Sequence, residues 1–284
     1  MPSALNELPV RRLTTGDLAS CVGLSESRGW PRDDHKWGLL LAAGRGYGID
    51  DPDGKGLATA CVVTVYGSGL AAIGMLLVAE EHARQGVGRR MLSHVIAEFG
   101  SVPLTLYATE TGRPLYEKLG FQAVGHAEMV RGRFHPLGQA PAAATRPATA
   151  ADLPGILRLD HEVFGEDRTH MITRLPAFSD QLRVAEDADG LTGYTAAWPS
   201  TDSDVVGPLI ARDTATAQAL IASLAAGTDR PLRVDIDVRH EELLDWVRAR
   251  GLETTSSNTV MTRSIADLPG DWTRRFAPLT VAAG

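Results

Sequence analysis

Cysteine is scarce in this chain of 284 residues. Its two cysteines, Cys21 and Cys61, lie in apolar surroundings and far apart in the sequence. Disulfide frameworks and zinc sites use more cysteines at closer spacing, so we expect neither of them, and no bound metal. Free cysteines suit a reducing compartment, and the first residues, 1–3, have no signal-peptide character. We therefore predict a cytoplasmic protein.

An excess of basic charge is also missing. The formal net charge is −7, and residues 1–140 carry equal numbers of basic and acidic side chains, so all of the excess acid lies in the second half. A phosphate backbone is held by basic patches, so this balance argues against nucleic acid as a partner. The acidic second half either attracts a cationic amine or is a solvated surface.

Charge is absent altogether from residues 56–79, a run long enough to suggest a membrane span. The sequence Gly67-Ser68-Gly69 divides this run into residues 58–66 and 70–79, each of strand length. Two apolar strands with a glycine turn between them predict a buried β-hairpin. We expect no membrane partner.

The chain is organised around the stretch from this hairpin to Gly100, which predicts a strand, a glycine turn and a helix. Apolar residues recur at helical spacing between 87 and 99, and Gly100 supplies a stop. Gly86 and Gly88 open the helix, so main-chain N–H groups are exposed at the positive end of its dipole. No lysine follows these glycines, and Met91 stands where a dinucleotide fingerprint has its third glycine. The turn thus predicts a phosphate site of another kind.

Two motifs resemble the GNAT superfamily of N-acetyltransferases. Residues 78–88 resemble its acetyl-CoA loop, whose usual pattern is Arg/Gln-x-x-Gly-x-Gly/Ala; both glycines match, whereas Ala83 stands at the leading position. Residues 108–121 end in Tyr116-x-x-x-Gly120-Phe121, which resembles the helix that carries the family's usual general acid. The two motifs occur in the family's order, with a strand between them.

The second half repeats the first in weakened form. Residues 136–148 are rich in proline and alanine and read as a linker. The residues that recur after it are Arg11, Thr14, Asp17 and Leu18, as Arg146, Thr149, Asp152 and Leu153. The order of predicted elements recurs too. The second copy has no glycine turn after residue 211, and Val247 occupies the place of Tyr116.

We therefore predict an α/β protein that resembles tandem GNAT proteins. Two GNAT-like domains follow one another, each a mixed, mostly antiparallel sheet flanked by helices. Residues 1–135 form the catalytic domain, 136–148 the linker, and 149–284 a degenerate domain. Two copies in one chain can replace a dimer, so we expect a monomer or a homodimer.

The resemblance implies acetyl-CoA (coenzyme A) as cofactor and names its site. In the family, strand main-chain groups hold the pantetheine arm, loop N–H groups bind the pyrophosphate, and a tyrosine gives a proton to the leaving thiolate. The implied catalytic groups are the Tyr116 hydroxyl and the Val78 N–H. The implied cofactor-binding residues are Leu76, Leu77, Val78, Arg84, Gln85, Gly86, Val87, Gly88, Arg89, Thr109, Gly112 and Tyr116.

The acceptor side is less determined by the sequence. Trp30, Asp34 and Trp37 flank the loop that lines the acceptor in the family, although both tryptophans also suit a core. The amine must lose a proton, and Asp33, Asp34, His35 and His82 are the candidate bases. The implied reaction is transfer of an acetyl group to an amine of a small molecule or amino-acid-like acceptor, by direct attack in a ternary complex. A protein lysine or N-terminal acetyltransferase and a non-catalytic acetyl-CoA sensor are the alternatives.

Overall fold

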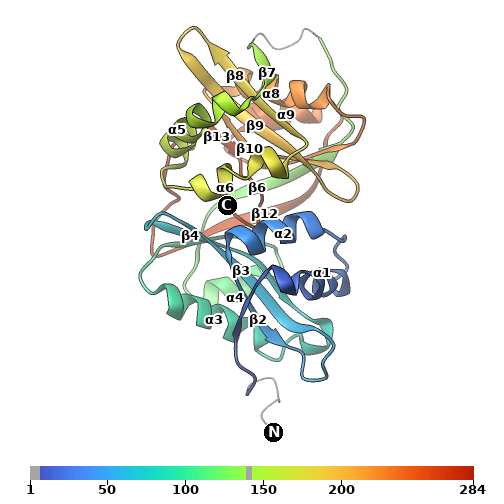
Figure 1. Ribbon diagram of the computed structural model, residues 1–284, viewed down its shortest axis with the longest axis vertical. Helices are drawn as coiled ribbons and strands as arrows, with labels where there is room; N and C mark the ends of the chain where they lie inside the picture. Colours follow the sequence, from blue (N-terminus) through green and yellow to red (C-terminus); the bar gives the residue numbers. More distant parts are fainter. Residues whose placement is uncertain (1–6, 139–142) are drawn as a thin grey trace.

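The computed structural model describes residues 7–138 and 143–284. Figure 1 shows two units of similar build, one from each half of the chain, stacked along the long axis of the molecule. Each unit is a β-sheet with helices on its faces.

The elements of the first unit are β1 (Arg11–Leu13), α1 (Leu18–Ser27), α2 (Asp34–Ala43), β2 (Arg45–Asp50), β3 (Leu57–Tyr66), β4 (Leu70–Val78), α3 (Val87–Phe99), β5 (Leu104–Ala108), α4 (Arg113–Lys118) and β6 (Gln122–Gly132). Those of the second are β7 (Thr145–Pro147), α5 (Leu153–Phe164), α6 (Thr169–Ile172), α7 (Leu175–Phe178), β8 (Gln181–Asp187), β9 (Gly190–Pro199), β10 (Asp204–Ala211), α8 (Thr214–Ala225), β11 (Leu232–Asp237), α9 (Glu241–Arg248), β12 (Glu253–Arg263) and β13 (Arg275–Ala277). Single 3-10 turns precede α1, α3 and α5, as η2 (Thr15–Asp17), η3 (Glu80–His82) and η4 (Ala150–Asp152).

The uncharged run forms the predicted hairpin, β3 and β4, at the centre of the first sheet. Its side chains alternate between two cores: Ala60 and Val62 pack with α1 and α2, whereas Cys61 and Val63 pack with α3. Because helices cover both faces, neither face of this hairpin needs polar side chains. No helix in residues 7–138 or 143–284 is both long and apolar enough to cross a membrane.

The two units share one sheet, of order β1-β2-β3-β4-β5-β12-β6-β11-β10-β9-β8-β7. At its middle the units interleave, since β12 of the second unit pairs with β5 and β6 of the first, and β6 pairs with β11 of the second. Only β4–β5 and β10–β11 are parallel pairs within the described residues. The predicted α/β class with mixed, mostly antiparallel pairing is confirmed.

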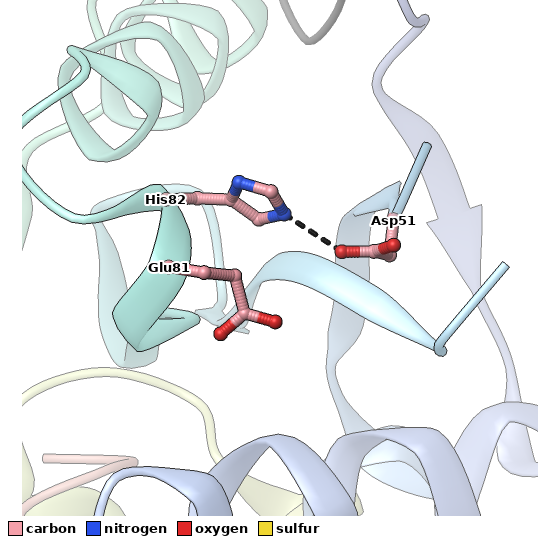
Figure 2. A group of neighbouring side chains, drawn as sticks. All are labelled: Asp51, Glu81 and His82. Atoms are coloured by element: carbon pink, nitrogen blue, oxygen red, sulfur yellow. Dashed lines mark hydrogen bonds and ion pairs between the residues drawn. The ribbon is translucent and has the colours of Figure 1, made fainter. Parts of the chain in front are cut away.

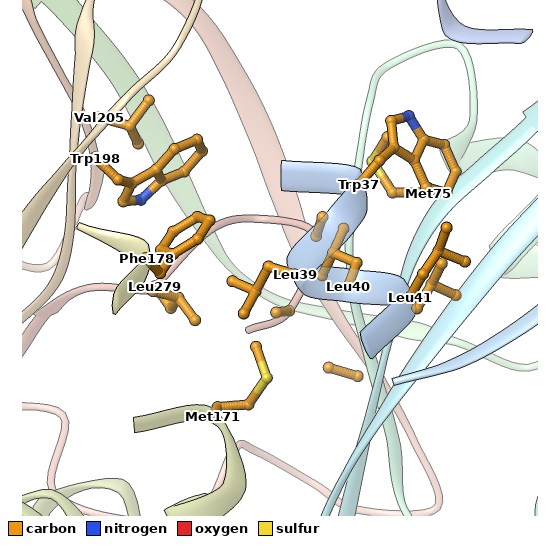
Figure 3. Close-up of a cluster of buried hydrophobic side chains, with 14 of the residues drawn as sticks. Trp37, Leu39, Leu40, Leu41, Met75, Met171, Phe178, Trp198, Val205 and Leu279 are labelled. Atoms are coloured by element: carbon orange, nitrogen blue, oxygen red, sulfur yellow. The ribbon is translucent and has the colours of Figure 1, made fainter. Parts of the chain in front are cut away.

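An apolar core also fills the space between the units. Figure 3 shows Leu39 of α2 facing Met171 of α6, Phe178 of α7 and Trp198 of β9, and all four side chains are buried in one cluster. Burial of this size stabilises the contact between the units, because each fully buried apolar side chain contributes roughly 1.5–3 kcal/mol. The relative placement of the units is therefore set by a core and not by a flexible tether.

The weak sequence repeat corresponds to a repeated structural device. In each unit a threonine and an aspartate form a capping box at the first helix, and an arginine of the first strand binds that aspartate. The residues are Arg11, Thr14 and Asp17 in the first unit and Arg146, Thr149 and Asp152 in the second. The predicted linker, residues 136–148, extends too far. Residues 145–147 form the edge strand β7 and pair with β8. Residues 139–142 of that linker lie outside the described residues.

Residues 264–284 return to the first unit. After β13 the chain ends between the two units, where the C label stands in Figure 1. The hydroxyl of Tyr66 donates to the carbonyl of Ala283. A Cβ at Gly74 would lie 2.0 Å from the carbonyl oxygen of Ala282, so only glycine lets the tail lie against β4.

Candidate active site

β4 and β5 separate where the predicted site begins. They pair over three residues, ending at Ile73 and Leu106. Beyond this point the register of β4 against β3 shifts, and Met75 takes a positive φ of 51°. A gap therefore opens between β4 and β5, and its edges carry main-chain groups without a strand partner.

The main chain of Val78 faces this gap. Val78 stands opposite Thr59 on β3, and the N–H of the following residue, Ala79, donates to the Ala58 carbonyl at 2.9 Å. Main-chain groups point alternately toward and away from an antiparallel partner, so those of Val78 point away from β3. Those of Leu77 point toward β3, and its carbonyl accepts from the Thr59 hydroxyl at 2.6 Å. The predicted role of Leu77 at the gap is therefore wrong.

The turn before α3 leaves main-chain N–H groups open. Arg84 and Gly86 take positive φ values of 60° and 83°, and Gly86 is the N-cap of α3 without a side-chain cap. The helix ladder starts at the Arg90 N–H, which donates to the Gly86 carbonyl at 3.0 Å. Residues 87–89 therefore precede the ladder, and within the described chain their N–H groups have no acceptor. The helix dipole adds positive potential there, which makes an anion site.

Of the side chains around this turn, one supports its shape, and two carry charges that are not paired within the described residues. The amide of Gln85 donates to the Glu81 carbonyl at 2.8 Å and so holds the turn. Arg84 and Arg89 are exposed and form no ion pair with residues 7–138 or 143–284. Arg90 is engaged elsewhere, with a main-chain carbonyl. Two guanidinium groups thus remain available to an anion at the turn.

A side-chain cluster fixes the start of the turn. Figure 2 shows His82 of η3 reaching Asp51, at the end of β2, with Glu81 beside them. The His82 Nε2 to Asp51 Oδ2 distance is 2.7 Å, and one ligand atom from each of the three residues lies within 4.8 Å of the others. The hydrogen bond with His82 lowers the pKa of Asp51 below its ordinary value. The hydrogen bond between His82 and Asp51 thus connects the β2–β3 turn to the start of the turn before α3.

Tyr116 lies on α4 with its ring half-buried. The ring meets Phe121 edge-on at 6.0 Å between centroids, and a Cβ at Gly112 would lie 3.0 Å from its Cε2 atom. Burial raises the pKa of Tyr116 above its ordinary value near 10. The hydroxyl therefore keeps its proton at neutral pH and is a hydrogen-bond donor.

A pocket of about 360 Å³ lies where the gap, α4 and the second unit meet. The predicted residues that line it are Trp30, Trp37, Leu76, Thr109 and Tyr116. Further lining comes from Tyr107 and Met129, from Trp198, Ser200, Arg233, Ser256 and Asn258, and from the tail at 280–282. A larger hollow, about 600 Å³, lies against α5 and β8 and contains none of the predicted residues.

One acceptor-side prediction, that of Asp34, needs correction. Asp33 and not Asp34 is the N-cap of α2, so Asp33 lines the pocket, while Asp34 turns outward and binds Arg32 at 2.7 Å. Trp37 lines the pocket but is fully buried, and its N–H donates to the Ser25 hydroxyl at 2.8 Å. Of the four candidate bases, Asp33 alone lines the pocket; His35 stacks on Phe178, and His82 binds Asp51.

The corresponding region of the second unit is closed. The N-terminus of α8 is capped by Asp213, whose carboxylate accepts from the Thr216 N–H at 2.8 Å. β10 and β11 pair only over 204–206 and 232–234, as β4 and β5 do, but β13 then pairs with β10 beyond that point. Buried Phe276 fixes β13 in the core of this unit. A carboxylate thus occupies the anion position, and a strand lies beside β10 where the first unit has a gap.

Comparison with known proteins agrees with this architecture. Residues 44–123 and residues 156–277 each match a model of the acetyltransferase (GNAT) domain. The uncharacterised N-acetyltransferase YitH of Bacillus subtilis is 31% identical over 232 residues, which cover 80% of this chain and 82% of that protein. The chain belongs to the GNAT family of acetyltransferases. It is accordingly an acyltransferase with two GNAT domains in tandem.

Solved structures show the same fold at low identity. A putative acetyltransferase from Pyrococcus horikoshii superposes on this GNAT protein with a TM-score of 0.80 at 16% identity, covering 98% of this chain and 96% of that one. A tandem GNAT protein from the clavulanic acid biosynthesis pathway gives a TM-score of 0.63 at 13% identity, covering 92% and 100%. The arrangement of two units in one chain is therefore shared with solved relatives.

Proposed function

We propose that this GNAT protein transfers the acetyl group of acetyl-CoA to the amine of a small molecule, by direct attack within a ternary complex. The observation that carries the proposal is the contrast between the two units. Only the first combines an open helix N-terminus, an open strand gap and a protonated tyrosine. The gap strand and the tyrosine line one pocket, and Gly88 at the helix start lies against Val78 of that strand.

The first unit offers a fitting site for each part of the cofactor. The open N–H groups of residues 87–89 and the free charges of Arg84 and Arg89 suit a pyrophosphate. The gap between β4 and β5 receives the pantetheine arm, which pairs with the main chain of Val78. Thr109 and Gly112 flank the arm beside Tyr116. Bound acetyl-CoA supplies an acyl group activated as a thioester.

The residues at the gap account for the proton and charge changes of transfer. The amine nitrogen forms a bond to the carbonyl carbon, the carbon–sulfur bond breaks, the nitrogen loses a proton and the sulfur gains one. The Val78 N–H points into the gap and stabilises charge on the carbonyl oxygen. Tyr116 donates the proton to sulfur. Asp33 is the candidate that receives the amine proton, directly or through water.

The pocket favours a small acceptor over a protein. It lies between the two units, with Thr280–Ala282 of the tail along its wall, and its volume suits a small molecule. A lysine or N-terminus of a protein requires an open groove for the flanking chain. The lining residues come from both units of one chain, which is compatible with activity as a monomer.

Release of coenzyme A in the presence of an amine panel tests the proposal, with Tyr116→Phe as the main variant. We expect the turnover number to fall at least about 100-fold with acetyl-CoA affinity little changed, since the phenol acts only during transfer. Tyr47→Phe is the matched control, because its hydroxyl bonds Glu98 at 2.5 Å on the α3 side, away from the pocket.

Three results would speak against the proposal. Wild-type protein that does not bind acetyl-CoA would remove its basis. Binding without turnover on any amine would favour the non-catalytic sensor. Full turnover by Tyr116→Phe would remove the tyrosine from the mechanism.

A further inference from the structure

The acceptor pocket contains charges from both units. Its charged lining residues are Asp33 and Lys36 from α2 and Arg233 from β11. The acid surplus of the second half therefore does not reach this lining, to which the second unit contributes a cation. The pocket lining therefore does not favour the alternative that acidic residues of this unit attract a cationic amine.

The one acid in the lining is already committed. Oδ1 of Asp33 accepts from the Lys36 N–H at 2.9 Å, which caps α2, and Oδ2 lies 3.2 Å from the Lys36 ammonium. The hydroxyl of Ser200 approaches the same carboxylate at 3.5 Å. Asp33 and Lys36 therefore largely neutralise one another, so neither attracts a charged ligand group strongly, while the Asp33 carboxylate keeps acceptor sites for the proton that leaves the amine.

Arg233 is only partly engaged. One nitrogen, Nη2, lies 3.2 Å from Oδ2 of the buried Asp235, on the same strand. No group in residues 7–138 or 143–284 accepts from its Nε or Nη1. The guanidinium has five N–H donors in a planar fork, so most of its hydrogen-bonding capacity is unused.

The buried unpaired polar atoms of the described lining are all hydrogen-bond donors. Among described residues, the buried lining atoms that lack a partner are the Arg233 Nε and the indole Nε1 of Trp198, whose side chain is 2% exposed. Both are donors. Among the described lining residues no buried acceptor lacks a partner, so the pocket complements a ligand group that accepts several hydrogen bonds, and a carboxylate is such a group.

We propose, building on the acetyltransferase function above, that the acceptor is an amine that also carries a carboxylate, which Arg233 binds while the amine lies toward Leu76 and Tyr116. A guanidinium fork matches a carboxylate in geometry and charge. Lys36 is paired to Asp33 and Arg233 is paired to Asp235, so the lining offers unused hydrogen-bond donors but little net positive charge, which suits a monoanion better than a phosphate dianion. The second unit thereby acts as a specificity wall for chemistry performed by the first.

The test compares amino acids that have amines at different distances from the carboxylate with their carboxamides, at equal concentrations of neutral amine. Initial rates of coenzyme A release give kcat/KM, and calorimetry on the coenzyme A complex gives binding without turnover. The variants are Arg233→Gln, Arg233→Lys and the control Arg131→Gln. Arg131 stands directly opposite Arg233 on β6 but binds Asp202 at 2.8 Å and does not line the pocket.

We expect at least one carboxylate to be preferred over its carboxamide. Arg233→Gln should lower kcat/KM for that carboxylate about 10- to 100-fold, mainly through KM, because a charge-assisted hydrogen bond is lost. The carboxamide, acetyl-CoA affinity and the Arg131→Gln protein should change little, and Arg233→Lys should recover part of the preference.

Two outcomes overturn the assignment while leaving acetyl transfer intact. One is equal use or equal binding of every carboxylate and its carboxamide by the wild-type protein. The other is an equal loss for both ligand types in Arg233→Gln. Failure of the wild-type protein to bind acetyl-CoA is a separate result, which removes the proposed function and this assignment with it.

Discussion

Replacing Gly86 by alanine tests the anion site at the start of α3 most directly. Gly86 has a φ of 83°, and a Cβ built on it meets no atom within 4 Å. The substitution therefore adds no clash and acts only through the backbone, because L-residues disfavour this left-handed conformation by about 1–2 kcal/mol. The loop relieves that cost by turning away, which misdirects the N–H groups of residues 87–89.

The expected loss of affinity follows from the same figure. To bind a pyrophosphate, the variant must return to the native loop conformation, so the Kd for acetyl-CoA should rise about 5- to 30-fold, at about 1.4 kcal/mol for each factor of ten. Isothermal calorimetry measures this change directly. The turnover number at saturating cofactor should change less, since the reacting groups lie elsewhere.

Gly100→Ala is the matched control at the other end of the same helix. Its φ is 59° and its ψ is −111°, a conformation that L-residues tolerate less than that of Gly86, and a Cβ there also meets nothing within 4 Å, so Gly100→Ala should lose at least as much stability in thermal unfolding as Gly86→Ala. Only Gly86→Ala should weaken cofactor binding. Equal Kd values for the two variants, or an unchanged Kd in Gly86→Ala, would refute the assignment of the anion site.

Three further outcomes are expected. Calorimetry should give one acetyl-CoA per chain, since β13 and Asp213 close the second unit; two equivalent sites would contradict this. Burial raises the pKa of Cys21 and Cys61 to about 12, so a thiol reagent at pH 8 should label neither in the native protein and both after denaturation, and rapid native labelling would be inconsistent with their burial. The raised pKa of Tyr116 keeps its donor form populated above pH 10, so kcat should not fall between pH 8 and 10; a decline with a midpoint near 10 would indicate an ordinary exposed phenol.

The first unit could largely be predicted from sequence because its signals are local. The uncharged hairpin, the helical spacing after the glycine turn and the Thr14–Asp17 capping box each depend on residues close in the chain. The glycine turn likewise has its chemistry in its own backbone. The wrong predictions also concern neighbouring residues. Asp34 is predicted at the acceptor, where Asp33 lies instead, and the main chain of Leu77 is predicted to face the gap, although of the two neighbours only that of Val78 does so.

The acceptor pocket could not be predicted in the same way. Trp198 and Arg233 reach it only because β6 and β12 interleave and bring the second sheet beside the first. No spacing in the sequence records that pairing. The position of residues 278–284 could not be predicted either. Their small and apolar side chains show no periodic pattern, and they can lie against β4 only because Gly74 has no side chain.

The second unit is closed at the position that corresponds to the open site of the first unit, and it contributes instead to the wall of that site. A capping carboxylate at Asp213 replaces the open N-terminus, so an anion would be repelled from α8. β13 then pairs with β10 and supplies the hydrogen bonds that a pantetheine arm would otherwise make. The chain continues from β13 past Leu279 to the wall of the first unit's pocket, so the strand that pairs along β10 in the second unit also positions the tail beside the gap of the first. Substitution of Phe276, which fixes β13, should therefore perturb the acceptor KM of the first unit while leaving its acetyl-CoA affinity intact, and an unchanged KM would separate the two roles of this segment.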